Sequence, residues 1–321
     1  MSYAIETFHL SKNYGNGRGC QDVTLRIPAG EAFGFLGPNG AGKSTIVKML
    51  VGLATPTDGK ALLFGEPAGS VEARRRIGYL PELFRYPGWL SGEEVLQFHG
   101  KLCGMKGPVL KSRINQLLDE VGIGQRGRDR IKGYSKGMQQ RLGLACALLT
   151  DPDIVFLDEP ASALDPVGRH EVRELLQRLR KEGKTIFLNS HLLEDVEQLC
   201  DHVALLNNGR ILADGQVSEV LRATSARWRF RVGGITPELL DWLRERMIVP
   251  VDMVPWQDGS VPEWGENWLE AELADDEQVG YMNRLLIDQG VTLYETHKVK
   301  SSLDEWFLQA VSGLEHRGEN R

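Results

Sequence analysis

Short apolar runs alternate with helical patterns over the first two-thirds of the chain. The apolar runs are Ala32–Leu36, Ile154–Leu157, Thr185–Leu188 and Val203–Leu206. The helical patterns between them are Ser44–Val51, Lys136–Leu149 and His170–Lys181. Strands that are apolar at every position are typical of a parallel sheet that helices cover on both faces. The alternation therefore predicts an α/β fold.

The pattern changes near Leu221, and the residues that follow predict a second, smaller unit. We expect a linker at residues 222–225 and then elements in the order βαββαβ. They are a strand at Trp228–Val232, a helix at Thr236–Arg246, strands at Val251–Trp256 and Trp268–Leu273, a helix from Asp275, a strand at Val291–Glu295 and a helix from Ser302. This order predicts a ferredoxin-like α+β unit. The predicted domains are residues 1–222 and 223–321.

Two segments of the second unit are predicted to be irregular. Asp258–Gly265 opens with Asp-Gly and contains Pro262, so it is predicted to be a hairpin loop. The polar residues from Glu315 onward predict a frayed end.

The composition is that of a globular protein, and it narrows the classes of function. Hydrophobic residues make up 41% and charged residues 26% of the 321 residues. The net charge of -6 argues against a dedicated nucleic-acid binder, which usually carries a basic face. The four cysteines are scattered and form no CxxC pair. We therefore expect reduced thiols rather than a disulfide framework or a metal site.

The sequence predicts no segment that crosses or enters a membrane. No apolar stretch approaches the roughly 20 residues that a membrane-spanning helix needs. Met1–Leu10 lacks a basic start followed by an apolar block, so it does not read as a signal peptide. We expect the chain to lie in the cytoplasm, where any membrane role depends on a partner.

A glycine-rich segment lies between the first buried strand and the first helix. It reads Gly37-Pro38-Asn39-Gly40-Ala41-Gly42-Lys43-Ser44-Thr45 and fits the phosphate-loop pattern G-x-x-x-x-G-K-S/T. Glycines let backbone N–H groups close around phosphate oxygens, and the helix directs its positive N-terminus at the same oxygens. Lys43 adds a charge near the outer phosphates, and the Ser44 hydroxyl suits Mg²⁺. The segment predicts a site for a nucleotide and Mg²⁺.

Two carboxylates follow the buried run Ile154–Leu157. Asp158 and Glu159 are adjacent on a strand, so their side chains point to opposite faces and suit different roles. Asp158 suits a partner of Mg²⁺ beside the phosphate loop, and Glu159 suits a general base for an attacking water. Two acids at a strand end are often only a solvated terminus. The phosphate loop upstream favours the catalytic interpretation.

The residues around these sites resemble the motifs of ATP-binding-cassette (ABC) nucleotide-binding domains. Tyr134-Ser135-Lys136-Gly137-Met138 resembles the signature of that family, whose common form is Leu-Ser-Gly-Gly-Gln followed by a helix. Ser162-Ala163-Leu164-Asp165 resembles its D-loop, and His191 resembles its switch histidine. Tyr14 matches the aromatic residue that stacks on adenine. The resemblance covers residues 1–220, with its elements in the order of the family.

The resemblance implies both a fold and a mechanism. The implied fold is a mixed, mostly parallel sheet with a helical subdomain, and the cofactors are ATP and Mg²⁺. Two copies would pair head to tail, so that Ser135 to Met138 of one copy contact the ATP held by the phosphate loop of the other. Ser135 precedes a helix, where its hydroxyl and nearby N–H groups form a second anion site. Glu159 would act as the base and His191 would contact the γ-phosphate.

The resemblance also implies partners and a location. An integral membrane permease, encoded as a separate chain, would bind this chain on the cytoplasmic face of the membrane. No nucleic-acid partner is expected. ATP binding would close the pair of ATPase subunits, and hydrolysis would release it.

Several positions depart from the common form of these motifs. The signature carries Tyr134 for Leu, Lys136 for the first Gly and Met138 for Gln. Ser135 and Gly137 remain, so the anion site at the helix start should remain as well. Glu82 stands where the Q-loop of the family usually has Gln, and its charge would alter the ATP site. These variants are similar to those of ATP-binding subunits of bacterial exporter-type systems.

Alternative functions stay open at this point. A soluble ABC ATPase without a permease, with a role in translation or DNA maintenance, is the alternative to a transporter subunit. The single phosphate loop and the lack of a long coiled coil between residues 45 and 134 argue against it. Residues 223–321 could also sense a ligand or hold a dimer, alongside transport. The segment Phe84–Phe98 is either a permease interface or a local helical core.

Overall fold

The computed structural model describes residues 2–15, 18–223, 227–246, 251–254, 266–299, 303, 306 and 307. The chain divides into two compact units, one ending at Val217 and the other beginning at Ser218. This division lies at the start of α8 (Val217–Ala223), whereas the predicted domain boundary lies at its end. The boundary between domains itself stays a prediction. Residues 224 and 225 of the predicted linker, the predicted hairpin loop at 258–265 and the frayed end from Glu315 lie outside the described residues.

The first unit is built around a six-stranded sheet in the order β10-β9-β3-β8-β7-β6. Its strands are β3 (Ala32–Leu36), β6 (Ile77–Leu80), β7 (Ile154–Asp158), β8 (Thr185–Asn189), β9 (His202–Asn207) and β10 (Arg210–Gln216). All neighbours pair in parallel except β9 and β10, which pair antiparallel. Every residue of β3, β7 and β8 is buried. The four predicted strands and the α/β class are confirmed.

A second, antiparallel sheet packs near the first and was not predicted. Its order is β2-β1-β4-β5, formed by β1 (Tyr3–Gly15), β2 (Arg18–Pro28), β4 (Asp58–Leu63) and β5 (Glu66–Pro67). The pairing of β1 with β2 shifts register at several points, and His9 and Asp22 have positive φ angles there. Such bulges interrupt the two-residue alternation by which a half-buried strand is recognised.

One hydrophobic core joins the two sheets through α1 (Lys43–Leu50). Its buried members include Ile5 and Leu63 from the antiparallel sheet, Ile46 from α1 and Phe35 from the parallel sheet. The Phe156 and Phe187 rings pack in the same core with centroids 5.4 Å apart. Burying a side chain of this size contributes roughly 1.5–3 kcal/mol. This packing fixes α1, and with it the loop that precedes α1.

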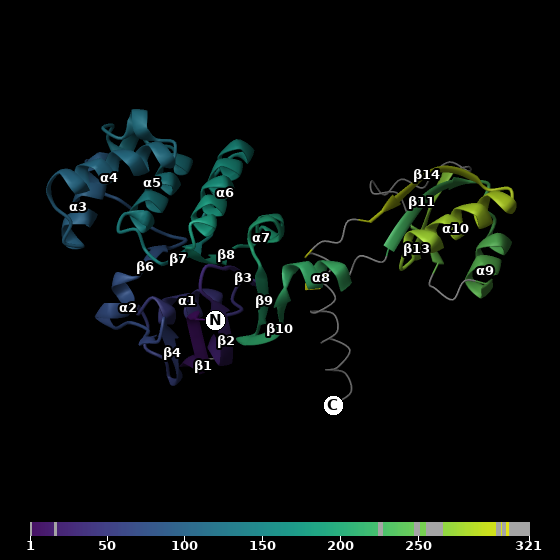
Figure 1. Cartoon of the computed structure of the whole chain (residues 1–321), viewed down its shortest axis with the longest axis horizontal. Helices are drawn as coiled ribbons and strands as arrows, with labels where there is room; N and C mark the ends of the chain where they lie inside the picture. Colours follow the sequence, from purple (N-terminus) through teal and green to yellow (C-terminus); the bar gives the residue numbers. More distant parts are fainter. Residues whose placement is uncertain are drawn as a thin grey trace. The chain divides into compact units, whose positions relative to one another are not determined.

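The remaining helices of the first unit pack against the parallel sheet, against the antiparallel sheet and against one another. They are α2 (Val71–Arg75), α3 (Gly92–Leu102), α4 (Gly107–Glu120), α5 (Lys136–Leu148), α6 (Pro166–Lys181) and α7 (Leu193–Leu199), with short 3-10 turns at Gly124–Arg126 and Ile131–Gly133. Figure 1 shows α3, α4 and α5 gathered together, away from the antiparallel sheet. This group is the helical subdomain that the family resemblance implied. The α6 helix begins at Pro166 rather than His170, because Asp165 caps it.

The second unit has the predicted βαββαβ order. It comprises β11 (Arg227–Gly233), α9 (Pro237–Arg246), β12 (Val251–Val254), β13 (Glu266–Glu272), α10 (Asp276–Asp288) and β14 (Thr292–Lys298). The sheet is antiparallel in the order β12-β13-β11-β14. It has its own core, in which Phe230 and Leu269 from the sheet pack with Leu243 from α9 and Met282 from α10. The smaller α+β unit expected from the sequence is confirmed.

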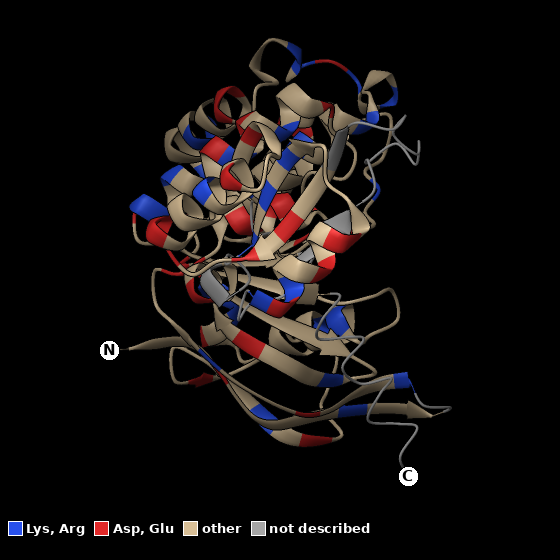
Figure 2. Cartoon of the chain, turned by 90° about the vertical axis from the view of Figure 1, so that its right-hand side faces the viewer, with Lys and Arg blue, Asp and Glu red and all other residues tan. Residues whose placement is uncertain are grey.

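Charge and hydropathy of the described residues agree with the composition. Figure 2 shows acidic and basic residues interspersed over the helices and strands, without a single basic face in that view. Among the described residues, no helix is both long and apolar enough to span a bilayer.

Candidate functional site

The phosphate loop joins the end of β3 to the start of α1. Gly37 and Gly42 have φ angles of 148° and 106°, which glycine adopts without strain. A Cβ at Gly37 would lie 2.1 Å from the carbonyl oxygen of Leu206, and one at Gly42 would lie 2.5 Å from that of Gly19. These contacts explain why the loop needs glycine at both places. No side chain caps the first turn of α1, so its N–H groups are available to an anion.

Lys43 lies inside its own loop. Its Nζ donates to the carbonyl oxygens of Gly37 at 2.6 Å and Pro38 at 3.2 Å. Burial lowers the pKa of Lys43, while the carboxylates of Glu159, Asp158 and Glu82 act in the opposite direction. The ammonium group is therefore only weakly solvated, and a phosphate would be a better partner for it than two neutral carbonyls.

Asp158 ends β7 and is 3% exposed. Burial raises its pKa, the hydrogen bond from Asn189 lowers it, and the nearby Glu82 and Glu159 raise it further. The Asn189 side-chain amide donates to Oδ1 of Asp158 at 2.5 Å. Oδ1 of Asn189 is buried and has no hydrogen-bond partner among the residues that the structure describes. Oδ2 of Asp158 and Oδ1 of Asn189 are therefore the side-chain oxygen atoms that this pair can offer to a ligand in the pocket.

Glu159 follows Asp158 in a left-handed backbone conformation, with φ of 55°. His191 holds both oxygens of its carboxylate. The backbone N–H of His191 donates to Oε1 at 2.9 Å, and ring Nδ1 lies 2.6 Å from Oε2. The predicted base and the predicted switch histidine therefore form one unit.

These groups line a single pocket of about 1110 Å³. Of the residues predicted to bind ATP or to catalyse, it is lined by Tyr14, Asn39, Gly40, Ala41, Gly42, Lys43, Ser44, Thr45, Glu82, Asp158, Glu159 and His191. Gly37 and Pro38 do not line it, but their carbonyls hold Lys43. Tyr14 is 54% exposed, with the Lys12 ammonium 5.2 Å from its ring centre. The open face of this ring is the surface on which a base could stack.

The signature residues do not line this pocket. Ser135 is the N-cap of α5, and its hydroxyl accepts from the backbone N–H of Met138 at 3.2 Å. Ser135 and Lys136 are exposed, and Gly137 is half-buried. Asp165 also lies outside the pocket and caps α6 by accepting from the N–H of Gly168 at 2.8 Å. Ser135 and Asp165 thus each start a helix at an exposed position outside the pocket.

The pocket includes residues that sequence reasoning did not identify. They are Arg18, Gly19, Ser162 and Asn189. Ser162 opens the segment already compared with the D-loop, and Asn189 ends a predicted strand two residues before His191. Their positions next to known motifs were the available signals. Arg18 and Gly19 had no comparable signal, because the antiparallel sheet that carries them was not predicted.

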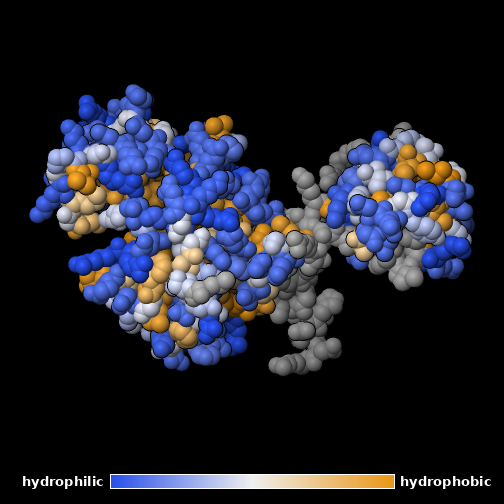
Figure 3. All heavy atoms as spheres, in the orientation of Figure 1, coloured by the Kyte–Doolittle hydropathy of each residue, from blue (hydrophilic) through white to orange (hydrophobic). Residues whose placement is uncertain are grey.

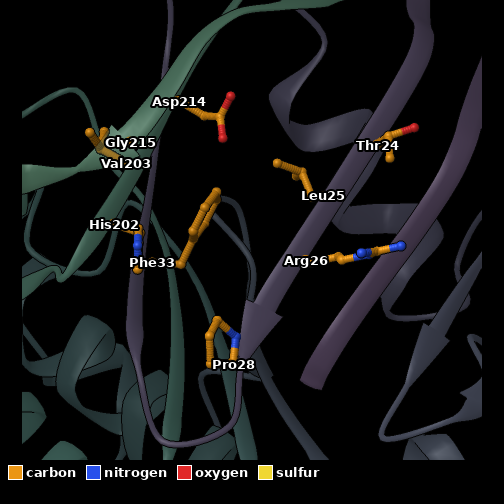
Figure 4. Close-up of a pocket in the computed structure, with 9 residues that line it drawn as sticks. All are labelled: Thr24, Leu25, Arg26, Pro28, Phe33, His202, Val203, Asp214 and Gly215. Carbon is orange, nitrogen blue, oxygen red and sulfur yellow. The ribbon is translucent and has the colours of Figure 1, made fainter. Parts of the chain in front are cut away.

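A smaller pocket of about 340 Å³ lies between β2 and the β9–β10 edge of the parallel sheet. Figure 4 shows Leu25, Phe33 and Asp214 around this space. It shares no lining residue with the larger pocket. In the described part of the chain, no three His, Cys, Asp or Glu side chains gather as a metal cluster.

The chain is similar to known proteins over both its first unit and its whole length. A family model described as ABC transporter matches residues 20–162. An uncharacterized ABC transporter ATP-binding protein of Synechocystis is 42% identical over 226 residues, which are 68% of this chain and 64% of that protein. The match thus spans just under two-thirds of that relative. The bacitracin transport ATP-binding protein BcrA of Bacillus licheniformis is 32% identical over 98% of this chain and 99% of its own.

Solved structures agree with these relatives. One described as the ATP-binding subunit of an ABC transporter has a TM-score of 0.63 and is 32% identical, over 68% of this chain and 92% of its own. The predicted recognition and fold class are confirmed at the level of the family. The chain belongs to the ATP-binding proteins of the ABC transporter family.

Proposed function

We propose that this chain binds Mg²⁺-ATP, pairs with a second copy and hydrolyses ATP to drive a separate membrane permease. The observation that carries the proposal is the gathering of phosphate loop, Asp158, Glu159 and His191 in one pocket. The uncapped first turn of α1 and the buried ammonium of Lys43 supply positive charge for the β- and γ-phosphates. Tyr14, at the rim, would stack on adenine.

The chemistry of the site fits Mg²⁺. Magnesium usually takes one or two carboxylates, substrate phosphates and several waters. Asp158 is a buried carboxylate whose pKa is raised by burial, so a cation beside it would favour its ionised form. Oδ1 of Asn189, buried without a partner, is placed to accept from a water bound to that cation. Ser44 and Glu82 also line the pocket and carry side-chain oxygen atoms. When bound, Mg²⁺ would neutralise phosphate charge.

Glu159 would act as the general base. Its side chain is 13% exposed and is held by His191 on both oxygens. A carboxylate in this position can accept the proton of a water that attacks the γ-phosphate. His191, with 61% of its side chain exposed, would donate to the γ-phosphate through Nε2 when its ring carries both protons, while Nδ1 donates to Glu159. The pair orients one water and one phosphate.

The second copy would complete the site with its signature. Ser135 and Lys136 are exposed at the start of α5, where N–H groups and a lysine favour an anion. They do not line the pocket of their own chain, so we expect them to contact the ATP bound in the pocket of a partner copy. Lys136, in place of the usual glycine, would add a positive charge to this contact. Because ATP would touch both copies only when they are closed, ATP binding would favour closure.

The permease would bind an apolar surface around α3. Leu83, Trp89, Phe98 and Leu102 are each more than half exposed. Figure 3 shows an apolar patch over the region of α3, surrounded by hydrophilic residues. Patches of this kind mark sites of protein contact. The proposed location is accordingly peripheral, on the cytoplasmic face of the membrane.

The relatives support an exporter-type system without naming a cargo for this chain. BcrA takes part in bacitracin transport, and a Nod factor export ATP-binding protein of Cupriavidus pinatubonensis is 36% identical over 69% of each chain. The similarity to BcrA over nearly the whole length supports the same kind of subunit for this chain. Cargo choice would belong to the permease.

Affinity purification from gently solubilised membranes tests the transporter assignment. Tagged Glu159→Gln protein is used with Mg²⁺-ATP, so that the closed state persists, and a Lys43→Ala, Glu159→Gln double variant is the matched control. We expect a multi-spanning membrane protein in stoichiometric amount with the first variant, and less when Trp89 is changed to Ala. Ribosomes, DNA-associated proteins or the homodimer alone would overturn the permease assignment and favour the soluble alternative.

A further inference from the structure

Gln140 connects the helix of the signature to the residue that carries the proposed base. It lies in α5, five positions after Ser135, and is 6% exposed. Its Nε2 donates to the main-chain carbonyl oxygen of Glu159 at 3.0 Å. A carbonyl oxygen can only accept, so this contact also fixes which end of the Gln140 amide faces Glu159.

The carbonyl it holds belongs to a residue with an unfavourable backbone. A left-handed conformation at a residue other than glycine persists only where its surroundings hold it. Around Glu159, the backbone N–H donates to the carbonyl of Asn189 at 2.9 Å, and the carbonyl also accepts from Oγ of Ser162 at 3.1 Å. Gln140 is the donor to Glu159 that comes from the helical subdomain. Without it, the donors left to this carbonyl in the described part of the chain are the hydroxyl and the N–H of Ser162, three residues further along the same segment.

A second link runs from the next residue of α5. Arg141 donates to the carbonyl of Val121 at 2.9 Å and to the carboxylate of Glu171 in α6 at 2.6 Å. Its contacts therefore stabilise the packing of helices, and none of them reaches Glu159. Gln140 differs from Arg141 in that its partner is the catalytic segment itself.

We infer that Gln140 is a positioning residue, which sets the direction of the Glu159 carboxylate by holding its peptide from the signature helix. This inference rests on the proposed role of Glu159 as base. The consequence is that α5, whose N-terminus would contact the ATP of the partner, is joined by a hydrogen bond to the base of its own ATP site. A small displacement of a base can cost up to about a hundredfold in rate.

The test separates ATP binding from turnover. Gln140→Met removes the donor and keeps the length of the side chain. We expect kcat to fall at least about tenfold while the ATP affinity and the midpoint of thermal unfolding stay close to wild type. Gln139→Met is the matched control, because Gln139 is the preceding residue on α5 and its side-chain amide donates to the carbonyl of Tyr134 at 3.4 Å, not to Glu159. Its kcat should be unchanged.

Two further variants distinguish positioning from packing. Gln140→His keeps an N–H donor at the same number of bonds from Cβ, so it should recover part of kcat. In a Glu159→Ala background, Gln140→Met should not lower the residual single-turnover rate again, because the group it positions is gone. If Gln140→Met lowers stability, Gln140→Leu, which is uncharged and also lacks the donor, replaces it in each measurement.

The outcomes also separate this inference from the proposed function. Near-normal kcat in Gln140→Met, or an equal loss with and without Glu159, overturns the positioning role even when Glu159→Gln abolishes hydrolysis. Normal turnover in Glu159→Gln would instead remove the base, and with it the inference. A loss of kcat at Gln140 that requires Glu159 and is relieved by His supports it.

Discussion

His191 contacts both carboxylate oxygens of Glu159, one through its backbone N–H and the other through its ring. The proposed base therefore cannot turn without breaking contacts with the histidine that we propose contacts the γ-phosphate. The proposed activation of water by Glu159 and the proposed contact of His191 with the γ-phosphate would thus depend on one pair of residues. The first prediction follows from this pair.

Glu159→Gln should lower kcat by about a hundredfold or more, because an amide cannot accept the proton of the attacking water. ATP binding should persist, and the dimer should become stable in ATP. Phosphate release and size-exclusion chromatography measure the two effects. Glu182→Gln, at an exposed position after α6, is the control. Near-normal turnover of the Glu159 variant would remove this residue as the base.

Lys43→Ala should weaken ATP binding by about tenfold to a hundredfold, the usual value of a hydrogen bond to a charged group. Its ammonium donates to two carbonyls and lies near three carboxylates. A bound phosphate would accept a hydrogen bond from the same ammonium. Fluorescent-nucleotide titration measures the affinity. Lys48→Ala, exposed on the same helix, should bind ATP normally. Equal affinity of the Lys43 variant and wild type would contradict the phosphate-loop assignment.

Asp158→Asn should stabilise the protein in the absence of Mg²⁺ and nucleotide at pH 7. Burial raises the pKa of Asp158 in the folded state, so the folded protein binds this proton more tightly than the unfolded chain. The stability due to the protonated carboxyl is full below the unfolded pKa of roughly 3.9 and is lost as pH rises through the raised value. Asparagine does not ionise, so the variant keeps this stability as the pH rises.

We expect a higher midpoint of thermal unfolding for the variant at pH 7, and the difference should shrink as the pH falls toward the unfolded pKa of roughly 3.9. Mg²⁺-ATP should then stabilise wild type more than the variant. Asp119→Asn, at an exposed position of α4, controls for the general effect of a lost charge. A lower midpoint for Asp158→Asn than for wild type at pH 7 would show that burial of the ionised Asp158 carboxylate does not destabilise the fold.

The two predicted domains should be separable. The core of the second unit is formed by its own strands and helices, so residues 223–321 should fold alone and unfold cooperatively. Residues 1–222 should keep the ATP affinity of the full chain, because every residue lining the pocket lies within them. Circular dichroism and nucleotide titration measure both. An insoluble 1–222 fragment, or one without ATP affinity, would place the boundary elsewhere.

The sequence predicted the parts of the fold that rest on local patterns. The all-apolar runs of β3 and β7 identified the parallel sheet, and the phosphate loop between β3 and α1 was recognisable from its spacing alone. The β1–β2 hairpin was missed, because the irregular residues at His9 and Asp22 interrupt its alternation. As a result, Arg18 and Gly19 were not placed in the site.

The contacts within the site were beyond sequence reasoning for a different reason. Gln140 and Glu159 are separated by 19 positions, and Asn189 and Asp158 by 31. No local pattern marks such pairs, since they depend on how α5 and β8 pack around β7. The sequence supplied the chemical groups, and the packing decided which of them meet.

The left-handed backbone at Glu159 sets activity against stability at one position. A residue with a Cβ in this conformation typically costs of order 1–3 kcal/mol, and glycine would relieve most of it. A selection for heat-resistant variants that ignores turnover would therefore enrich Glu159→Gly and return inactive protein. Selection for the proposed transport function would instead keep glutamate at this position, although its backbone conformation destabilises the fold. The hydrogen bonds of Glu159 with Asn189, Ser162 and Gln140 offset this loss of stability.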